Sequence, residues 1–421
     1  MNAFIGLSDR DRFELSGSEL EEWLTQPALA KEILLRNQVE EDFEETYADD
    51  EDNENDLVIS TDQAIRTPKS TVQYGLFDSI EEIPPKNDLL RFKAKNINVS
   101  IKYLDNASIA QINADTVFTG LGFEDRTFAS NDFLSKLAKP KRVYAIRYKL
   151  NGYSDAIIDS WAKAQIKVDE IMYSSPAVMF PDVDGLAIVD VSGLSKPLIY
   201  KTIHRELSKK GRVIVCHAAA QKYYPLQEDL EKLIALNQSE DQAAFLESLA
   251  EVLMGEKGPY SDIRLLDENS DPTRSRALLA FASAKHERLF SLLDRREFDY
   301  IEVVTPVEDT PRAKVSALAA DFIVQNYQNA KVTNIDTDDL FGLVSFLDDQ
   351  YLDLYSAAGA NLEIGLTGSK TQAVAAAILS SKRKIAQAWY LSPKEFDEKR
   401  FSTGVGPIKI YDISIPGSEE H

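Results

Sequence analysis

The sequence predicts an α/β fold in which two Rossmann-like halves, each a parallel sheet with helices on both faces, are fused by internal duplication. Two observations carry this prediction. Short apolar runs alternate with helical stretches from Asp115 onward, a pattern typical of parallel sheets covered by helices. Two pairs of stretches also share one order of residue types: Leu186–Pro225 with Asn361–Phe396, and Thr116–Arg126 with Leu278–Arg288.

The region before the first half carries weaker signals. Residues 1–56 have a weakly helical start and end in an acidic run, Glu40–Asp56, which repels itself and is expected to be disordered. This run is either a solvated linker or, on a sharper reading, a nucleic-acid mimic or a docking tail for a basic partner. Residues 57–110 contain short alternating apolar segments, which predict a small β-rich element packed on the first half.

The remaining boundaries follow from the duplication. The first Rossmann-like half covers residues 111–225 and the second covers 275–415. Between them, residues 226–274 form a helical insertion and linker with two amphipathic helices and one expected strand, Asp262–Leu266. The second half has an extra helix of its own at Asp338–Leu354.

Each half ends in a strand, a polar turn, a helix and a further strand. The turns are Ser192-Gly193-Leu194-Ser195-Lys196 and Thr367-Gly368-Ser369-Lys370. In a doubly wound sheet, ligands bind at the carboxyl ends of the strands, where both turns lie. If the halves pack about a pseudo-twofold axis, the turns face each other and form one pocket for a phosphate-bearing ligand. The candidate ligand-binding residues are Ser192, Gly193, Ser195, Lys196, Thr367, Gly368, Ser369 and Lys370.

Two alternatives to this ligand site stay open. Ser and Thr are preferred helix N-caps, so both turns could serve only as caps with solvated lysines. The pairs Asp125-Arg126 and Glu287-Arg288 begin the first helix of each half. Arg126 and Arg288 are therefore candidate phosphate contacts, or else members of structural ion pairs that brace the loops.

Composition excludes several classes of protein. The chain has 421 residues, of which 44% are hydrophobic, enough for two or three domains. Its net charge of −22 argues against a broad nucleic-acid or anionic-membrane surface, although a local basic pocket is compatible with it. The sequence has no 18-residue apolar run and no signal-peptide pattern at its start, so we expect a cytoplasmic protein.

Catalytic and cofactor motifs are not found. Cys216 is the single cysteine, and the four histidines lack metal-ligand spacing, so we expect no disulfide, metal or cofactor. Gly120 and Gly122 do not complete a dinucleotide fingerprint, and no Walker loop is present. Cys216 and His217 are adjacent on a strand and point to opposite faces, which excludes a thiol–imidazole pair. A non-enzymatic protein is favoured, and a phosphodiesterase-like enzyme is the remaining enzymatic interpretation.

The two turns resemble a known family. Leu366–Gln372 and, more loosely, Val191–Lys196 are similar to the late turn of CARF domains in CRISPR-associated sensors. Two such halves in one chain resemble the SAVED arrangement of bacterial antiviral signalling, over roughly residues 110–415. The resemblance implies recognition of a cyclic or linear oligonucleotide second messenger between the halves. Such sensors usually carry an effector, and none is found in the first 110 residues, which implies a protein partner with the effector activity.

These observations favour a cytoplasmic sensor or regulatory subunit that binds a nucleotide or oligonucleotide through its phosphates, in antiviral defence. The alternative is a non-enzymatic adaptor or scaffold. Its acidic run and helical insertion would dock a partner protein, and its Rossmann-like halves would be structural.

Overall fold

The computed structural model describes residues 92–93, 97–149, 153–228, 231, 256–267, 270–308, 310–396 and 402–416. Several sequence expectations lie outside these residues. They are the weakly helical start, the acidic run Glu40–Asp56, most of the small β-rich element and nearly all of the two helices expected between residues 226 and 254.

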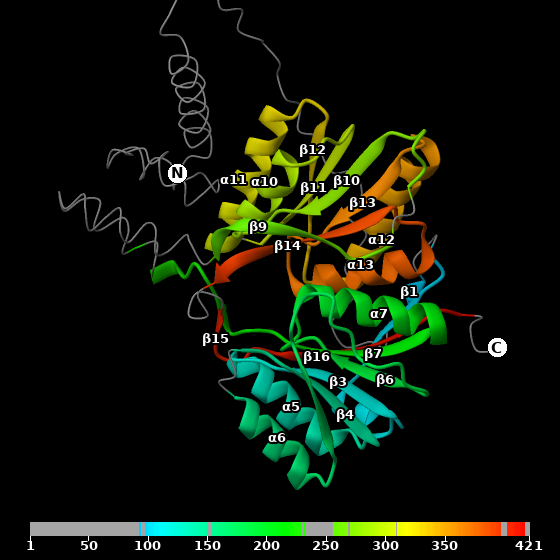
Figure 1. Cartoon of the computed structure of the whole chain (residues 1–421), viewed down its shortest axis with the longest axis vertical. Helices are drawn as coiled ribbons and strands as arrows, with labels where there is room; N and C mark the ends of the chain where they lie inside the picture. The colour runs from blue at the N-terminus through cyan, green and yellow to red at the C-terminus, as the bar shows by residue number, and fades with distance from the viewer. Residues whose placement is uncertain are drawn as a thin grey trace, which may run out of the picture.

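Two sheets, one in each half, form the centre of the molecule (Figure 1). The first has the strand order β1-β2-β16-β7-β6-β3-β4-β5, and the second has the order β12-β11-β10-β13-β14-β9. In each, parallel strands lie in the middle and helices cover both faces, so the predicted α/β class with two Rossmann-like halves is confirmed.

The first half contains parallel strands built from near-continuous apolar runs, as expected for strands covered on both faces. Its strands are β1 (Phe92–Lys93), β2 (Ser100–Tyr103), β3 (Thr116–Leu121), β4 (Arg142–Arg147), β5 (Val168–Met172), β6 (Ala187–Asp190) and β7 (Arg212–Ala218). Its helices are α4 (Asn106–Ala110), α5 (Asp125–Leu137), α6 (Ser154–Lys163) and α7 (Lys196–Lys210). Helices α5 and α6 pack on one face of the sheet and α7 on the other.

The second half repeats this arrangement. Its parallel strands are β10 (Arg276–Phe281), β11 (Tyr300–Pro306), β12 (Ala330–Ile335), β13 (Asn361–Gly365) and β14 (Gln387–Phe396). Its helices are α10 (Glu287–Asp294), α11 (Pro311–Asn326), α12 (Leu340–Tyr351), which continues as a π-helix η1 (Leu352–Ala357), and α13 (Lys370–Lys382). Helices α10 and α11 cover the outer face, while α12 and α13 cover the face that looks toward the first half.

Helices α7 and α13 join the two halves. One apolar core runs from the inner face of the first sheet, through these helices, to the inner face of the second sheet. Small residues such as Ala375, Ala376 and Ala377 are fully buried in it and allow the helices to approach closely. Tyr200 on α7 also donates a hydrogen bond to the Ser380 hydroxyl on α13, at 2.7 Å.

Each sheet also contains one strand from the segment that comes directly after the other half in the sequence. The chain leaves β7 in the first half and forms β9 (Glu256–Arg264), which pairs antiparallel with β14 in the second sheet. It later leaves β14 and forms β16 (Ile408–Ser414), which pairs antiparallel with β7 in the first sheet. The sequence predicted a shorter strand at Asp262–Leu266 in a linker. The domain boundaries predicted above stay a prediction, but this exchange ties both halves together.

The two connections that cross between the halves contact one another. Strand β8 (Lys222–Tyr223) follows β7, strand β15 (Ser402–Thr403) follows β14, and the two pair antiparallel. This two-stranded crossover ribbon places Tyr223 opposite Ser402. It brings both residues to the start of α5, where they take part in the site described next.

The strand exchange predicts that the halves unfold together. Ile413 on β16 is fully buried in the shared core, so Ile413→Ala should cost about 2–4 kcal/mol of unfolding free energy. Two single-tryptophan proteins report on the two halves: both carry Trp23→Phe, and one keeps only Trp161 whereas the other keeps only Trp389. Their urea midpoints should be equal, and Ile413→Ala should lower both by the same amount. The half-exposed Val405, changed to Ala, is the control. A shift of the Trp161 midpoint alone would show that the halves are independent.

Candidate ligand site between the two halves

A pair of lysines crosses between the halves. Lys370, at the start of α13, donates from Nζ to the carbonyl oxygen of Ser192 in the first turn. Lys196, at the start of α7, donates from Nζ to the carbonyl oxygen of Leu366 beside the second turn, at 3.4 Å. Each lysine thus leaves its own half and contacts the turn region of the other. The structure therefore brings the two predicted turns together.

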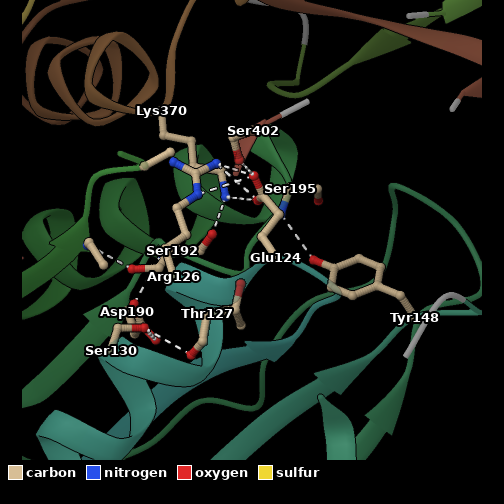
Figure 2. Close-up of polar contacts among 12 residues, drawn as sticks. Glu124, Arg126, Thr127, Ser130, Tyr148, Asp190, Ser192, Ser195, Lys370 and Ser402 are labelled. Atoms are coloured by element: carbon tan, nitrogen blue, oxygen red, sulfur yellow. Dashed lines mark hydrogen bonds and ion pairs between the residues drawn. The ribbon is translucent and has the colours of Figure 1, made fainter. Parts of the chain in front are cut away.

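A buried carboxylate lies beside Lys370 (Figure 2). Glu124, which precedes α5, accepts hydrogen bonds from Arg126 Nε at 3.1 Å and from Arg126 Nη2 at 2.7 and 2.9 Å. Lys370 Nζ lies 3.5 Å from Glu124 Oε2, and the Ser402 hydroxyl also donates to Glu124. Arg126 completes the group by donating from Nη1 to the Tyr223 hydroxyl at 3.2 Å. We call these five residues, Glu124, Arg126, Tyr223, Lys370 and Ser402, the Glu124 cluster.

The charges of the cluster change the pKa values of its members. Burial alone would raise the pKa of Glu124, but the positive charges of Lys370 and Arg126 outweigh it and lower that pKa to about 2. Burial and the charge of Arg126 lower the pKa of Lys370 to about 8, although Glu124 opposes the change. Glu124 therefore stays ionised near neutral pH, whereas Lys370 begins to lose its proton just above it.

Two further basic side chains border the cluster. Burial, together with the charges of Arg126 and Lys370, lowers the pKa of His217 to about 3, so this imidazole is neutral. Its Nε2 is buried and makes no hydrogen bond within the described residues. Arg312, from the second half, lies 4.8 Å above the ring of Tyr223, and burial lowers its pKa.

Cys216 lies on the opposite face of β7 from His217. It is fully buried among the apolar side chains under α5 and α6, and burial raises the pKa of its thiol well above the ordinary value. This placement agrees with the exclusion of a thiol–imidazole pair.

The residues of the second turn serve local structure. Ser369 is the N-cap of α13 and forms a capping box with Gln372, so its hydroxyl accepts from a backbone N–H at 3.2 Å. The Thr367 hydroxyl donates to the Phe281 carbonyl at 2.6 Å and ties the turn to β10. A side chain at Gly368 would meet Phe281 Cβ at 2.6 Å, so close packing requires this glycine.

In the first turn, Ser192 and Gly193 are also committed to packing. The Ser192 hydroxyl accepts from the Ala218 N–H at 2.8 Å, and its own N–H donates to Asp190 at 3.0 Å. A Cβ on Gly193 would lie 2.7 Å from the carbonyl oxygen of Gly120, so the turn can approach β3 only with glycine at this position.

Ser195 differs from its counterpart Ser369. It occupies the N-cap position of α7 but does not cap the helix, and its buried hydroxyl lies close enough to the Tyr148 and Tyr173 phenols to influence the pKa of both. Its N–H donates to the Tyr148 hydroxyl at 3.0 Å. The ring of Tyr148 in turn lies 4.9 Å from that of Tyr173. The other predicted contact, Arg288, is buried and lies 5.3 Å above the ring of Tyr390.

Several residues of the site carry no sequence signal. Tyr148, Tyr173 and Ser402 follow strands or lie in connections, and no motif marks them. Glu124 precedes a predicted pair, Asp125-Arg126, but only the fold brings Lys370 and Ser402 onto it. The sequence does not predict that the connection after β14 crosses to the first half and places Ser402 beside Glu124.

The described part of the chain contains neither a membrane-spanning helix nor a cluster of metal ligands. No helix there is long and apolar enough to cross a membrane. No group of three or more His, Cys, Asp or Glu side chains in the same residues is placed to hold a metal ion.

Comparisons with known proteins show limited likeness. No family model and no curated protein matches the sequence. One similar solved structure is described as a Type III CRISPR defence DNA nuclease activated by cyclic oligoadenylate. It has 10% identity and a TM-score of 0.42, and the match covers 69% of this chain and 67% of that one. Another is M. jannaschii TYW2 in complex with AdoMet, at 19% identity, 39% and 68% coverage and a TM-score of 0.18. Both TM-scores are below 0.5, too low for either likeness to establish a shared function.

The Glu124 cluster predicts a specific acid sensitivity. Because the folded pKa of Glu124 is about 2 and its ordinary value is 4.5, the ionised carboxylate stabilises the fold above pH 4.5. That contribution, on the order of 3 kcal/mol, is lost as the pH falls from 4.5 through 2. Urea unfolding at several pH values should show a wild-type advantage over Glu124→Gln that shrinks in this window. Glu228→Gln, at an exposed ion pair, should behave like wild type throughout. An advantage independent of pH would mean that the charge of Glu124 is not what stabilises the fold.

Proposed function

We propose that the protein is a cytoplasmic sensor or regulatory subunit that binds a nucleotide or oligonucleotide by its phosphates, between its two halves, in antiviral defence. In this proposal it is not an enzyme, and a partner protein carries the effector activity. The observation that carries the proposal is the convergence of cations from both halves on one carboxylate.

The negative charge near these cations only partly compensates for their burial. Arg126 and Lys370 both contact Glu124, and Arg312 lies close enough to Arg126 for their charges to repel. Asp338 and Glu308 attract Arg312, and Asp190 attracts Lys370, but burial still lowers the pKa of both cations. Because burial still disfavours the charged forms of these cations, a bound anion would stabilise this arrangement. A phosphate, with several strong acceptor oxygens, suits it.

Glu124 acts as an internal anion for these cations. Its carboxylate accepts hydrogen bonds from Arg126 and Ser402 and lies 3.5 Å from Lys370, as a phosphate oxygen would. A phosphate ligand would therefore have to displace Glu124 or share its cations. Such competition keeps weak anions out, because only a ligand with enough charge and contacts can replace a carboxylate that is already in place.

The crossing lysines give such a ligand a means to join the halves. Both donate to backbone carbonyl oxygens of the other half, and Lys370 also lies 3.5 Å from Glu124. A hydrogen bond to a charged phosphate is roughly twice as strong as one to a neutral carbonyl, so each of these two contacts would be strengthened by exchange for a ligand phosphate. A ligand held by Lys196 and Lys370 would bridge the two halves.

The defence role and the effector partner are supported by the sequence resemblance to CARF and SAVED sensors, carried by Leu366–Gln372. The site itself supports the ligand class.

The lysines provide the first test of the proposal. A panel of cyclic and linear oligonucleotides, mononucleotides and dinucleotides is screened by thermal shift. A ligand at about 100 times its Kd should stabilise the fold by about 2.7 kcal/mol, which is a visible rise in Tm. The shift should vanish in the double variant Lys196→Ala, Lys370→Ala. Lys141→Ala, which removes an exposed surface lysine, is the control. A flat panel with folded protein would retire the sensor proposal.

The pKa of Lys370 provides a second test. Lys370 loses its proton above pH 8 in the unliganded protein, whereas a bound phosphate would hold the proton. Affinity should therefore fall above pH 8, by up to about tenfold per pH unit. Isothermal titration of any ligand found above should show this decline in wild type. Lys370→Arg, which stays charged, should give a flat profile. The same decline in both proteins would assign the pH dependence to another group.

A further inference from the structure

The two halves correspond position by position, because their strands pair in the same register. In the first sheet, Thr116 on β3 lies opposite Arg142 and Ala187. In the second sheet, Ala277 on β10 lies opposite Tyr300 and Leu362. Counting along the paired strands from these positions matches Tyr148 with Pro306, Tyr173 with Ile335 and His217 with Tyr390.

One side of the inter-half site is aromatic. Tyr148 and Tyr173 stack at a tilt with ring centroids 4.9 Å apart, and Tyr390 lies close enough to influence the pKa of both phenols. The buried hydroxyl of Ser195, which influences the pKa of both phenols, lies at the same place. The counterparts of the two stacked tyrosines, Pro306 and Ile335, can supply neither an aromatic ring nor a hydroxyl group.

The other side is charged. There Lys370 and Arg126 surround the carboxylate of Glu124. The residue that occupies the same place before α10 is His286, which brings no carboxylate to the second half. The pseudo-twofold relation of the folds is therefore not matched by the chemistry of the site.

Both sides flank a single turn. The carbonyl of Ser192 takes the hydrogen bond from Lys370, and the N–H of Ser195 donates to Tyr148. Ser192 and Ser195 are three residues apart, so the two contacts are separated by at most about 10 Å. A ligand that reaches from the cations to the tyrosines needs a phosphate and an aromatic ring at that separation. A single nucleotide unit has both.

We infer that the inter-half site selects an unsymmetrical ligand, a linear oligonucleotide with a terminal 5′-phosphate, over a twofold-symmetric cyclic one. This rests on the proposed function. The terminal phosphate, which carries more charge than an internal phosphodiester, lies at Arg126 and Lys370, and the first base stacks on Tyr173 and Tyr148. A symmetric ligand presents the same group to both sides and leaves one of them mismatched.

The test is isothermal titration of the full chain with matched dinucleotides of each base. Three forms are compared: linear with a 5′-phosphate, linear without it, and the symmetric 3′,5′-cyclic form. For the preferred base, the 5′-phosphorylated form should bind at least tenfold more tightly than either of the others. Tyr173→Leu should weaken its binding by about tenfold, through lost stacking. Tyr173→Phe, which keeps the ring, should retain it, and Tyr300→Leu, at an exposed tyrosine outside the site, is the control.

The outcomes separate this inference from the proposed function. A cyclic form that binds as tightly as the linear one overturns the inference and leaves the sensor intact. Equal affinity of Tyr173→Leu and wild type overturns the aromatic contact. No binding of any nucleotide to folded protein overturns both proposals.

Discussion

The packing of α7 against α13 determines where the groups of the inter-half site lie. Both helices begin at a polar turn, and their close contact, through buried alanines and the Tyr200–Ser380 hydrogen bond, places the two beginnings side by side. Lys196 and Lys370 can then reach across to the opposite turn. The shared apolar core holds the two helices rigidly, because separating its close-packed side chains would raise the free energy of the folded state steeply. A change in the relative position of the helices would therefore alter the contacts of both lysines with the opposite turns.

Within this frame, the polar groups divide into two kinds. The hydroxyls of Thr367, Ser369 and Ser192 form hydrogen bonds with backbone groups and hold the turns in shape. Glu124, Arg126 and Lys370 satisfy one another, and burial still lowers the pKa of Lys370. Groups of the first kind cannot leave their backbone partners without disturbing the fold, whereas groups of the second kind can exchange partners. In the function proposed above, groups of the second kind contact the ligand and the turns support them.

The fold followed from local patterns, and the site did so only in part. Apolar periodicity and the repeated turn predicted the parallel sheets, the helices and the position of Lys196 and Lys370, because each of these depends on residues close in sequence. The strand exchange could not be read in this way. Whether β16 completes its own sheet or the other one depends on connections that lie far apart in the sequence. Tyr223 and Ser402 reach Arg126 and Glu124 only through the pairing of those connections. Ser369 and Ser195 looked equivalent in the sequence, yet only the first caps its helix.

The strand exchange also has a consequence for the order of folding. The second sheet takes β9, which precedes its other strands in the chain, whereas the first sheet takes β16, which follows the whole second half. Because β16 lies between β2 and β7, the first sheet can complete its hydrogen bonds only after the chain through β16 has been synthesised. The half that comes first in the sequence is therefore the half whose sheet is completed last.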